Sequence, residues 1–374
     1  MALYNKYRPK SLSEVCGQDH IREILSSQIR KNDTVHSYLF VGPAGTGKTT
    51  VARILAAMVN CSSGQTVDIS QEDENVAAIF RGGTLDVMEL DAATSNGIDE
   101  VRQLRERLKY APTVMRKKVL ILDECHRLTD AAWEGLLKIL EEPPPYATFV
   151  LCTTEPHKIR ETIKSRCMIL NFKSLSAKDV RELLRKISKS EGIEIAEDAL
   201  SLLASYSHGS FRLGISGLEQ LKHLSGKIDS AGVARVLGAI DRGTSRDFLT
   251  AVVGRRFLDA LSASSKAISS GVKSIDFLCG LAEVMHDLLV SIAKGYDLSA
   301  IGYTEDDKQA LSSLQSEILL RVDSRKYSEF VRHWIRTVDH ACRLTVYNLE
   351  PQFHADYVFA ELLATLKKYE TSSQ

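Results

Sequence analysis

The chain of 374 residues carries no excess charge of either sign, because 48 lysines and arginines balance 48 aspartates and glutamates. This balance excludes a basic field over the whole surface, so any contact with nucleic acid has to be local. Also missing is an apolar run approaching the roughly 20 residues that a membrane-spanning helix needs. The first residues, MALYNKYRPK, lack the apolar core of a signal peptide. We therefore expect a cytoplasmic protein without a membrane partner.

Paired cysteine spacing is missing as well. The seven cysteines are scattered along the chain, at Cys16, Cys61, Cys125, Cys152, Cys167, Cys279 and Cys342. This scatter predicts free thiols in a reducing compartment. Repeats and low-complexity tracts are also absent. The length suggests two or three domains, and 44% hydrophobic with 26% charged residues is typical of globular proteins.

What the sequence does contain is a glycine-spaced loop between an apolar run at 38–41 and a helical pattern from Thr49. Its spacing fits the phosphate loop G-x-x-x-x-G-K-[ST]. The loop and the first residues of the helix are Gly42, Pro43, Ala44, Gly45, Thr46, Gly47, Lys48, Thr49 and Thr50. Glycines let successive backbone N–H groups turn toward phosphate oxygens, and the helix N-terminus adds partial positive charge. With Lys48 to reach the β- and γ-phosphates and Thr49 to ligate Mg²⁺, the loop predicts binding of a nucleoside triphosphate.

Two further apolar runs end in polar residues suited to phosphate chemistry. Residues 119–122 end in Asp123-Glu124, the Walker B arrangement. There Asp123 is expected to hold Mg²⁺, and Glu124 to act as general base toward the attacking water. Residues 148–152 end in Thr153-Thr154, where a hydroxyl would face the γ-phosphate or its water. A threonine pair at a strand end is common, so an ordinary structural role remains open for Thr154.

The predicted elements alternate between strand and helix only in the first part of the chain. Strand patterns occur at 38–41, 85–90, 119–122, 148–152 and 168–172. Such alternation predicts a parallel five-stranded sheet with helices on both faces. After about Lys173 only helical patterns follow, so the rest of the chain is expected to be all-α.

Several motifs stand in the order found in clamp-loader ATPases. They are YNKYRPKSLSEVCGQ, GPAGTGKTT, DAATSNGIDEVRQL, LKYAP, VLILDECHRLT, LLKILEEPP, CTTEPHKIRETIKSRC and HGSFR, and together they cover roughly residues 4–220. On the basis of these motifs, the chain is identified as a member of the gamma/tau subunits of the bacterial DNA polymerase III clamp loader, which are AAA+ ATPases. It is a diverged member that resembles the shorter gamma form.

This resemblance implies three domains: an AAA+ ATPase module at 1–174, a helical lid at 175–241 and a helical collar at 242–374. The collar would join the chain to other clamp-loader subunits in a pentameric ring. With ATP and Mg²⁺ as cofactors, the ring would open a sliding clamp and load it onto primer–template DNA. A DNA polymerase is a further partner that the resemblance allows.

The resemblance also assigns roles to single residues. Thr154 matches the sensor 1 position, beside the Lys48, Thr49, Asp123 and Glu124 already named. Arg166, in the SRC triplet, matches the arginine finger that reaches the adjacent subunit's site. Arg212 matches the sensor 2 arginine, and Arg8 falls in the nucleotide-binding segment. For Arg166 and Arg212, ordinary surface arginines are the alternative.

Two neighbouring stretches match the family's contacts with DNA and clamp. Arg102 and Arg105 lie on a predicted helix that would line the DNA-facing inner surface of the ring. The loop after it would touch the clamp through Tyr110, Pro112, Val114 and Met115. A solvated helix face with compensating i,i+4 pairs is the alternative for the arginines.

The sequence departs from the family at two places. A zinc module with four cysteines is expected after the phosphate-loop helix, but only Cys61 is present, and Ser70, Asp73 and Val76 stand at the other positions. One thiolate cannot build a tetrahedral zinc site, so we expect no zinc. In the lid, Leu213-Gly214-Ile215 replaces the usual Asp-Ala-Leu, which affects the expected placement of Arg212.

Two other functions are compatible with the motifs. The chain could be a ring subunit that binds ATP without hydrolysing it, although the phosphate-loop, Walker B and finger residues are all present. It could also be a related AAA+ DNA-remodelling ATPase, such as a branch-migration motor. LKYAP, SRC and the length of the helical tail favour the clamp loader.

Overall fold

The computed structural model describes residues 2–82, 84–95, 97–240, 242–269, 271–291, 305–345 and 350–370. The chain divides into two compact units, one formed by Met1–Leu175 with Gly209–Arg212 and the other by Ser176–His208 with Leu213–Gln374. The first division lies next to the predicted boundary at 174/175. The boundary predicted at 241/242 falls inside the second unit and next to a residue outside the described ones, so separate lid and collar domains stay a prediction.

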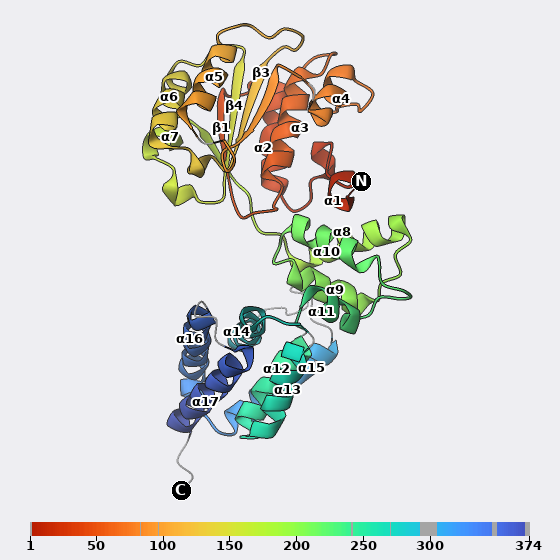
Figure 1. The fold of residues 1–374 in the computed structure, drawn as a ribbon, viewed down its shortest axis with the longest axis vertical. Helices are drawn as coiled ribbons and strands as arrows, with labels where there is room; N and C mark the ends of the chain where they lie inside the picture. Colours follow the sequence, from red (N-terminus) through yellow and green to blue (C-terminus); the bar gives the residue numbers. More distant parts are fainter. Residues whose placement is uncertain are drawn as a thin grey trace. The chain divides into compact units, whose positions relative to one another are not determined.

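The first unit is built on a five-stranded parallel sheet (Figure 1). Its strands are β1 Ser37–Val41, β2 Val87–Asp91, β3 Lys118–Asp123, β4 Ala147–Thr153 and β5 Met168–Asn171. They lie in the order β2-β3-β4-β1-β5. Val41 pairs with Thr153, and Asp91 with Asp123, so the carboxyl ends of neighbouring strands meet at one edge of the sheet.

Helices cover both faces of this sheet (Figure 1). One face packs against α2 Asp19–Lys31, α3 Lys48–Asn60 and α4 Glu74–Arg81, and the other against α5 Ile98–Leu108, α6 Asp130–Glu141 and α7 Glu161–Lys164. Tyr38 and Phe40 of β1 enter the first core, whereas Leu39 and Val41 enter the second. A strand buried on both faces explains the uninterrupted apolar run in the sequence. The predicted α/β fold of this part is confirmed.

Short elements complete the first unit. They are the helix α1 Leu3–Lys6 and the 3₁₀ turns η1 Leu12–Glu14, η2 Cys125–Arg127 and η3 Pro156–Lys158. The predicted strand at 85–90 begins two residues later than expected, at Val87, and Leu85 is exposed. The helix α4 was not predicted, and it starts at the end of the polar stretch 61–76.

The second unit is helical throughout its described part, apart from two isolated bridges, Ile195 with Ile228 and Val322 with Glu370. Its helices are α8 Ala177–Glu191, α9 Glu197–Tyr206, α10 Phe211–Leu221, α11 Ser230–Leu237, α12 Arg242–Val253, α13 Phe257–Ser269, α14 Ser274–Val290, α15 Glu305–Leu319, α16 Tyr327–Leu344 and α17 Pro351–Tyr369, with the 3₁₀ turn η5 Ser324–Lys326 before α16. The first two residues of α10 belong to the first unit. A large core forms around Trp334, Phe248, Phe277 and Phe330. Among the described residues, no helix is both long and apolar enough to cross a membrane.

Candidate nucleotide-binding site

The phosphate loop leaves the carboxyl end of β1 and enters α3, as the glycine spacing predicts. Close packing explains two of its glycines. A Cβ on Gly42 would lie 2.4 Å from the Phe172 carbonyl oxygen, and one on Gly45, where φ is +76°, would lie 1.9 Å from Ser210 Oγ. Only residues without a side chain let the backbone pass here.

Lys48, the first residue of α3, is buried at the centre of this loop. Its Nζ donates to the carbonyl oxygens of Gly42 at 2.8 Å and Pro43 at 2.9 Å. Burial lowers the pKa of Lys48. A buried ammonium beside the free N–H groups of a helix N-terminus suits a polyphosphate.

The two predicted magnesium ligands lie against each other. Thr49 Oγ1 donates to Asp123 Oδ2 at 2.6 Å, although 74 residues separate them in the sequence. The sheet order brings these two residues together, because β1, which precedes Thr49, and β3, which ends at Asp123, both lie next to β4. A hydroxyl and a carboxylate are hard oxygen ligands of the kind that Mg²⁺ binds together with substrate phosphates. The residues present therefore fit a magnesium–nucleotide complex.

Glu124 occupies a strained backbone conformation directly after β3. Its φ of +46° and ψ of +42° are left-handed, which costs a residue with a side chain about 1–3 kcal/mol. Its Oε2 accepts a hydrogen bond from Thr154 Oγ1 at 2.9 Å. The structure thus brings the predicted general base together with the predicted sensor residue at the ends of neighbouring strands.

Arg8 and Arg212 both lie in the first unit, near the phosphate loop. Arg8 Nε donates to Thr50 Oγ1 at 3.0 Å, and burial lowers the pKa of Arg8. The amide of Phe211 donates to the Gly45 carbonyl at 3.2 Å, which holds the next residue, Arg212, beside the loop. The altered sequence after Arg212 does not prevent this placement.

Arg212 makes a contact that the sequence did not predict. Its Nη2 donates to the hydroxyl of Tyr4 at 3.0 Å, and its guanidinium carbon lies 4.8 Å from the centre of the Tyr4 ring. The aromatic residue 208 positions earlier carries no local signal of this role.

Arg166 makes its contacts away from the phosphate loop. Its Nη2 pairs with Glu141 Oε1 at 2.7 Å, and its Nη1 donates to the carbonyl of Thr162 at 2.7 Å. Glu141 belongs to the LEEPP motif, so the structure links two of the recognised motifs through one ion pair.

The expected DNA and clamp residues lie on α5 and the loop after it. Arg102 is exposed and pairs with Asp99 at 3.1 Å, whereas Arg105 Nε is buried and has no partner in the described part of the chain. Tyr110 and Val114 are 71% and 76% exposed, and Pro112 is half-buried. Met115, in contrast, is only 8% exposed and packs in the core beside α3. Met115 is therefore removed from the expected clamp contacts.

Residues that motif reading passed over also surround Glu124. His126 lies 3.3 Å from Glu124 Oε2, 3.0 Å from Thr153 Oγ1 and 3.1 Å from Glu155 Oε1. The histidine follows the Walker B pair within DECH, and its position two residues after the predicted general base is the one local signal that could have indicated it.

The stretch at the expected zinc positions is joined by hydrogen bonds instead. The Asp73 carboxylate accepts from the Cys61 thiol at 3.2 Å and from the amide and hydroxyl of Ser62. It also caps α4 by accepting from the amides of Asn75 and Val76. Within the described residues, no cluster of three metal-ligating side chains occurs.

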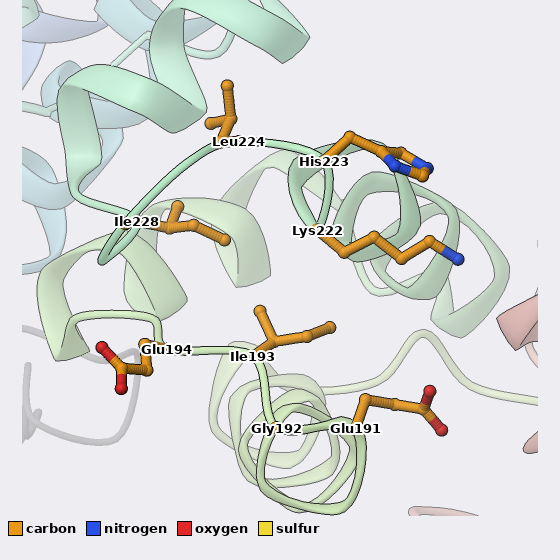
Figure 2. A pocket seen from close by; sticks show the side chains of 9 residues that line it. Glu191, Gly192, Ile193, Glu194, Lys222, His223, Leu224 and Ile228 are labelled. Atoms are coloured by element: carbon orange, nitrogen blue, oxygen red, sulfur yellow. The ribbon is translucent and has the colours of Figure 1, made fainter.

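A separate cavity of about 490 Å³ lies in the second unit (Figure 2). Two segments line it, 191–194 at the end of α8 and 222–228 after α10, and backbone hydrogen bonds of Ile228 with Glu194 and Ala196 join them. Its lining mixes Glu191 and Lys222 with apolar residues. None of the predicted site residues lies there.

Family models match two parts of the chain. The family described as DNA polymerase III, delta subunit matches residues 17–176, and that of DNA polymerase III subunits gamma and tau domain III matches residues 228–328. The Holliday junction branch migration motor RuvB of Thermotoga maritima aligns over 66% of this chain and 79% of its own, with 21% identity and a TM-score of 0.47. That likeness is too low to bear on what this chain does.

Curated relatives align over most of the chain. The DNA polymerase III subunit gamma/tau of Mycoplasma genitalium is 37% identical over 304 residues, which are 81% of this chain and 51% of the relative. The tau subunit of Bacillus subtilis is 35% identical over 290 residues, or 77% of this chain and 52% of the relative. The chain thus spans about half the length of these relatives. With these alignments and the gamma and tau domain on its second half, the chain belongs to the gamma/tau family of DNA polymerase III subunits.

Proposed function

We propose that this chain is the ATP-hydrolysing motor subunit of a sliding-clamp loader, which opens the clamp and loads it onto primer–template DNA in the cytoplasm. The observation that carries the proposal is the contact between Glu124 and Thr154 at the same sheet edge as Lys48, Thr49 and Asp123. A subunit that only bound ATP would need the phosphate loop but not an oriented general base.

Each residue of the site has a distinct task in hydrolysis. Lys48 and the N-terminus of α3 bind the phosphates, while Thr49 and Asp123 would hold Mg²⁺. The metal, when bound, neutralises charge on the β- and γ-phosphates. Glu124 orients the attacking water and accepts its proton. Thr154 holds Glu124 by one carboxylate oxygen, and Arg8 and Arg212 flank the nucleotide.

Hydrolysis would depend on assembly of a pentameric ring. Arg166 is exposed, and its contacts involve no phosphate-loop residue, which supports a role at the adjacent subunit's site. An arginine finger supplied in this way is typically worth roughly 10³–10⁵ in rate. The pair with Glu141 supports a fixed direction for the Arg166 side chain.

The remaining partners follow from the same proposal. Arg102 and Arg105 would contact DNA phosphates, a form of recognition that is steeply salt-dependent. Tyr110, Pro112 and Val114 would touch the clamp, and a DNA polymerase would join the assembly. The match of residues 228–328 to the gamma and tau domain supports a loader over another AAA+ remodeller.

The test is the ATPase rate of the assembled ring with clamp and primed DNA, for wild type, Arg166→Ala and Glu124→Gln. We expect low activity in the isolated chain and strong stimulation in the ring. Both variants should lose that stimulation, Glu124→Gln by about 10²–10⁴-fold because the general base is removed. Stimulation by DNA alone, without the clamp, would instead indicate a DNA remodeller.

Arg30→Ala is the matched control, because Arg30 is exposed on α2 and makes no ion pair in the described part of the chain. It should keep the wild-type rate. An Arg166→Ala ring that hydrolyses ATP at the wild-type rate would disprove the finger in trans, and the chain would then act as a self-contained ATPase.

A further inference from the structure

His126 lies in the 3₁₀ turn that follows β3, and its side chain is only 4% exposed. Both of its ring nitrogens have partners. Nδ1 lies 3.0 Å from Thr153 Oγ1 and 3.3 Å from Glu124 Oε2, and Nε2 lies 3.1 Å from Glu155 Oε1. A buried histidine with every polar atom engaged has one defined orientation.

These partners lie at the ends of two neighbouring strands, β3 and β4. Glu124 follows β3, whereas Thr153 ends β4 and Glu155 starts the connection beyond it. The β4 side is itself rigid, because the amide of Glu155 donates to Thr153 Oγ1 at 3.0 Å and Lys158 pairs with the Glu155 carboxylate at 2.9 Å. The imidazole therefore cross-links the two strand ends that carry the proposed base and sensor.

The contacts on Glu124 are unequal between its two oxygens. Thr154 and His126 both approach Oε2, at 2.9 Å and 3.3 Å. No protein group in the described part of the chain is bonded to Oε1. The carboxylate is therefore held through Oε2, and Oε1 is left to bind a water molecule.

We propose that His126 is a positioning residue for Glu124. It fixes the carboxylate rotamer from its Nδ1 side, and Glu155 holds the imidazole from the opposite side. This inference rests on the proposed ATPase function. Without the histidine, the Glu124 side chain keeps the hydrogen bond from Thr154 but loses the imidazole that lies 3.3 Å from the same oxygen, and it becomes free to turn about that bond. A displacement of about 1 Å at a reacting group can cost 10²-fold in rate.

The two ring nitrogens can be tested separately, because asparagine and glutamine amides reach the positions of Nδ1 and Nε2 respectively. His126→Asn keeps a polar group toward Glu124 and Thr153 but loses the contact with Glu155. His126→Gln keeps the contact with Glu155 but loses the one with Glu124. Positioning from the Nδ1 side predicts that His126→Asn retains most of kcat, whereas His126→Gln and His126→Ala each lose about 10–100-fold.

The measurements are kcat and KM for ATP in the assembled ring with clamp and primed DNA, and ATP affinity of the isolated chain. KM and ATP affinity should stay within about twofold of wild type, because His126 contacts no phosphate-loop residue. Combining His126→Ala with Glu124→Gln should lower the rate no further than Glu124→Gln alone, because both act through one carboxylate. His340→Ala, an exposed histidine on α16, serves as the control and should keep the wild-type rate.

The possible outcomes distinguish a failure of this inference from a failure of the proposed ATPase function. If Glu124→Gln is as active as wild type, the proposed ATPase mechanism fails. If Glu124→Gln is inactive but His126→Ala keeps its full kcat, the positioning role is overturned. Equal losses in the Asn and Gln variants, or a double variant slower than Glu124→Gln by the full effect of His126→Ala, would overturn it as well. Because the Asn and Gln variants retain a polar side chain, this comparison remains decisive if His126→Ala fails to fold.

Discussion

At the scale of single residues, Asp73 organises the segment 61–76, which carries only one of the four cysteines of the zinc module that the resemblance leads us to expect. One carboxylate joins Cys61 and Ser62, after α3, to the first turn of α4. Although burial acts in the opposite direction, hydrogen bonds from Ser62, Val76 and Cys61 lower the pKa of Asp73 well below its usual value. The ionised form is therefore the one that the folded chain stabilises.

We predict that Asp73→Ala destabilises the first unit by about 1–2 kcal/mol at pH 7, the usual cost of losing a helix cap. Because the folded-state pKa is depressed, this contribution is fully present above the unfolded pKa of about 3.9 and is lost progressively as the pH falls from there through the folded-state pKa. Urea unfolding at pH 7 and pH 3 measures the change. The loss in free energy of unfolding caused by Asp73→Ala should be smaller at pH 3 than at pH 7. Glu72→Ala, at an exposed neighbouring position, should cause no loss at either pH.

A deficit of equal size at both pH values would contradict this account of Asp73. It would mean that the side chain acts through packing rather than through its charge.

At the scale of elements, the loop between α5 and β3 is held by the buried carboxylate of Asp86, the residue directly before β2. The side chain of Asp86 accepts hydrogen bonds from the amides of Thr113 at 3.0 Å, Val114 at 2.9 Å and Met115 at 3.0 Å. This turn buries Met115 in the core and leaves the side chains of Val114 and Tyr110 exposed. The element thus presents a rigid apolar surface, defined here as Tyr110, Pro112 and Val114.

We predict that Asp86→Ala weakens binding of the clamp by about tenfold or more. Without the Asp86 carboxylate the loop is no longer ordered in the free chain, and the free energy of ordering it is then subtracted from the binding free energy. Surface-bound clamp and soluble chain variants would give the dissociation constants, and hydrogen exchange would report on the loop. Val114→Ala should weaken binding without faster exchange. Asp68→Ala, at an exposed position, should change neither.

A clamp affinity that stays at the wild-type value while exchange in 110–115 accelerates would remove this loop from the clamp interface.

At the scale of the whole molecule, the two compact units have separate cores. Two cores flank the sheet of the first unit, and a third lies among α12 to α17 of the second. Trp334 is fully buried in the third core, where its Nε1 donates to the Leu362 carbonyl at 3.1 Å and its ring lies 4.5 Å from that of Phe330. The residues predicted to bind the nucleotide all belong to the first unit.

We therefore predict that Trp334→Ala lowers the free energy of unfolding of the second unit by about 3–5 kcal/mol, the usual cost of emptying such a site. ATP affinity of the isolated chain should stay unchanged. Thermal unfolding and binding of a fluorescent nucleotide measure the two effects, and Leu320→Ala, at an exposed leucine, is the control. A parallel fall in ATP affinity would show that the two units do not hold their structures independently.

The sequence alone determined the features that depend on neighbours within a few residues. The phosphate loop needs glycines, Lys48 and Thr49 within eight positions, and the Walker B pair needs an apolar strand directly before it. Strand and helix periodicities also extend over short stretches, so the α/β character of the first part and the helical character of the rest were predictable.

Only the tertiary structure decided which distant residues meet. The order β2-β3-β4-β1-β5 brings Thr49 to Asp123 and Thr154 to Glu124, and local spacing contains no record of that order. Packing likewise buried Met115, joined Arg212 to Tyr4 and enclosed His126 between two carboxylates. Contacts of this kind depend on how whole elements pack, because a side chain's partners come from every element that shares its core or its sheet edge.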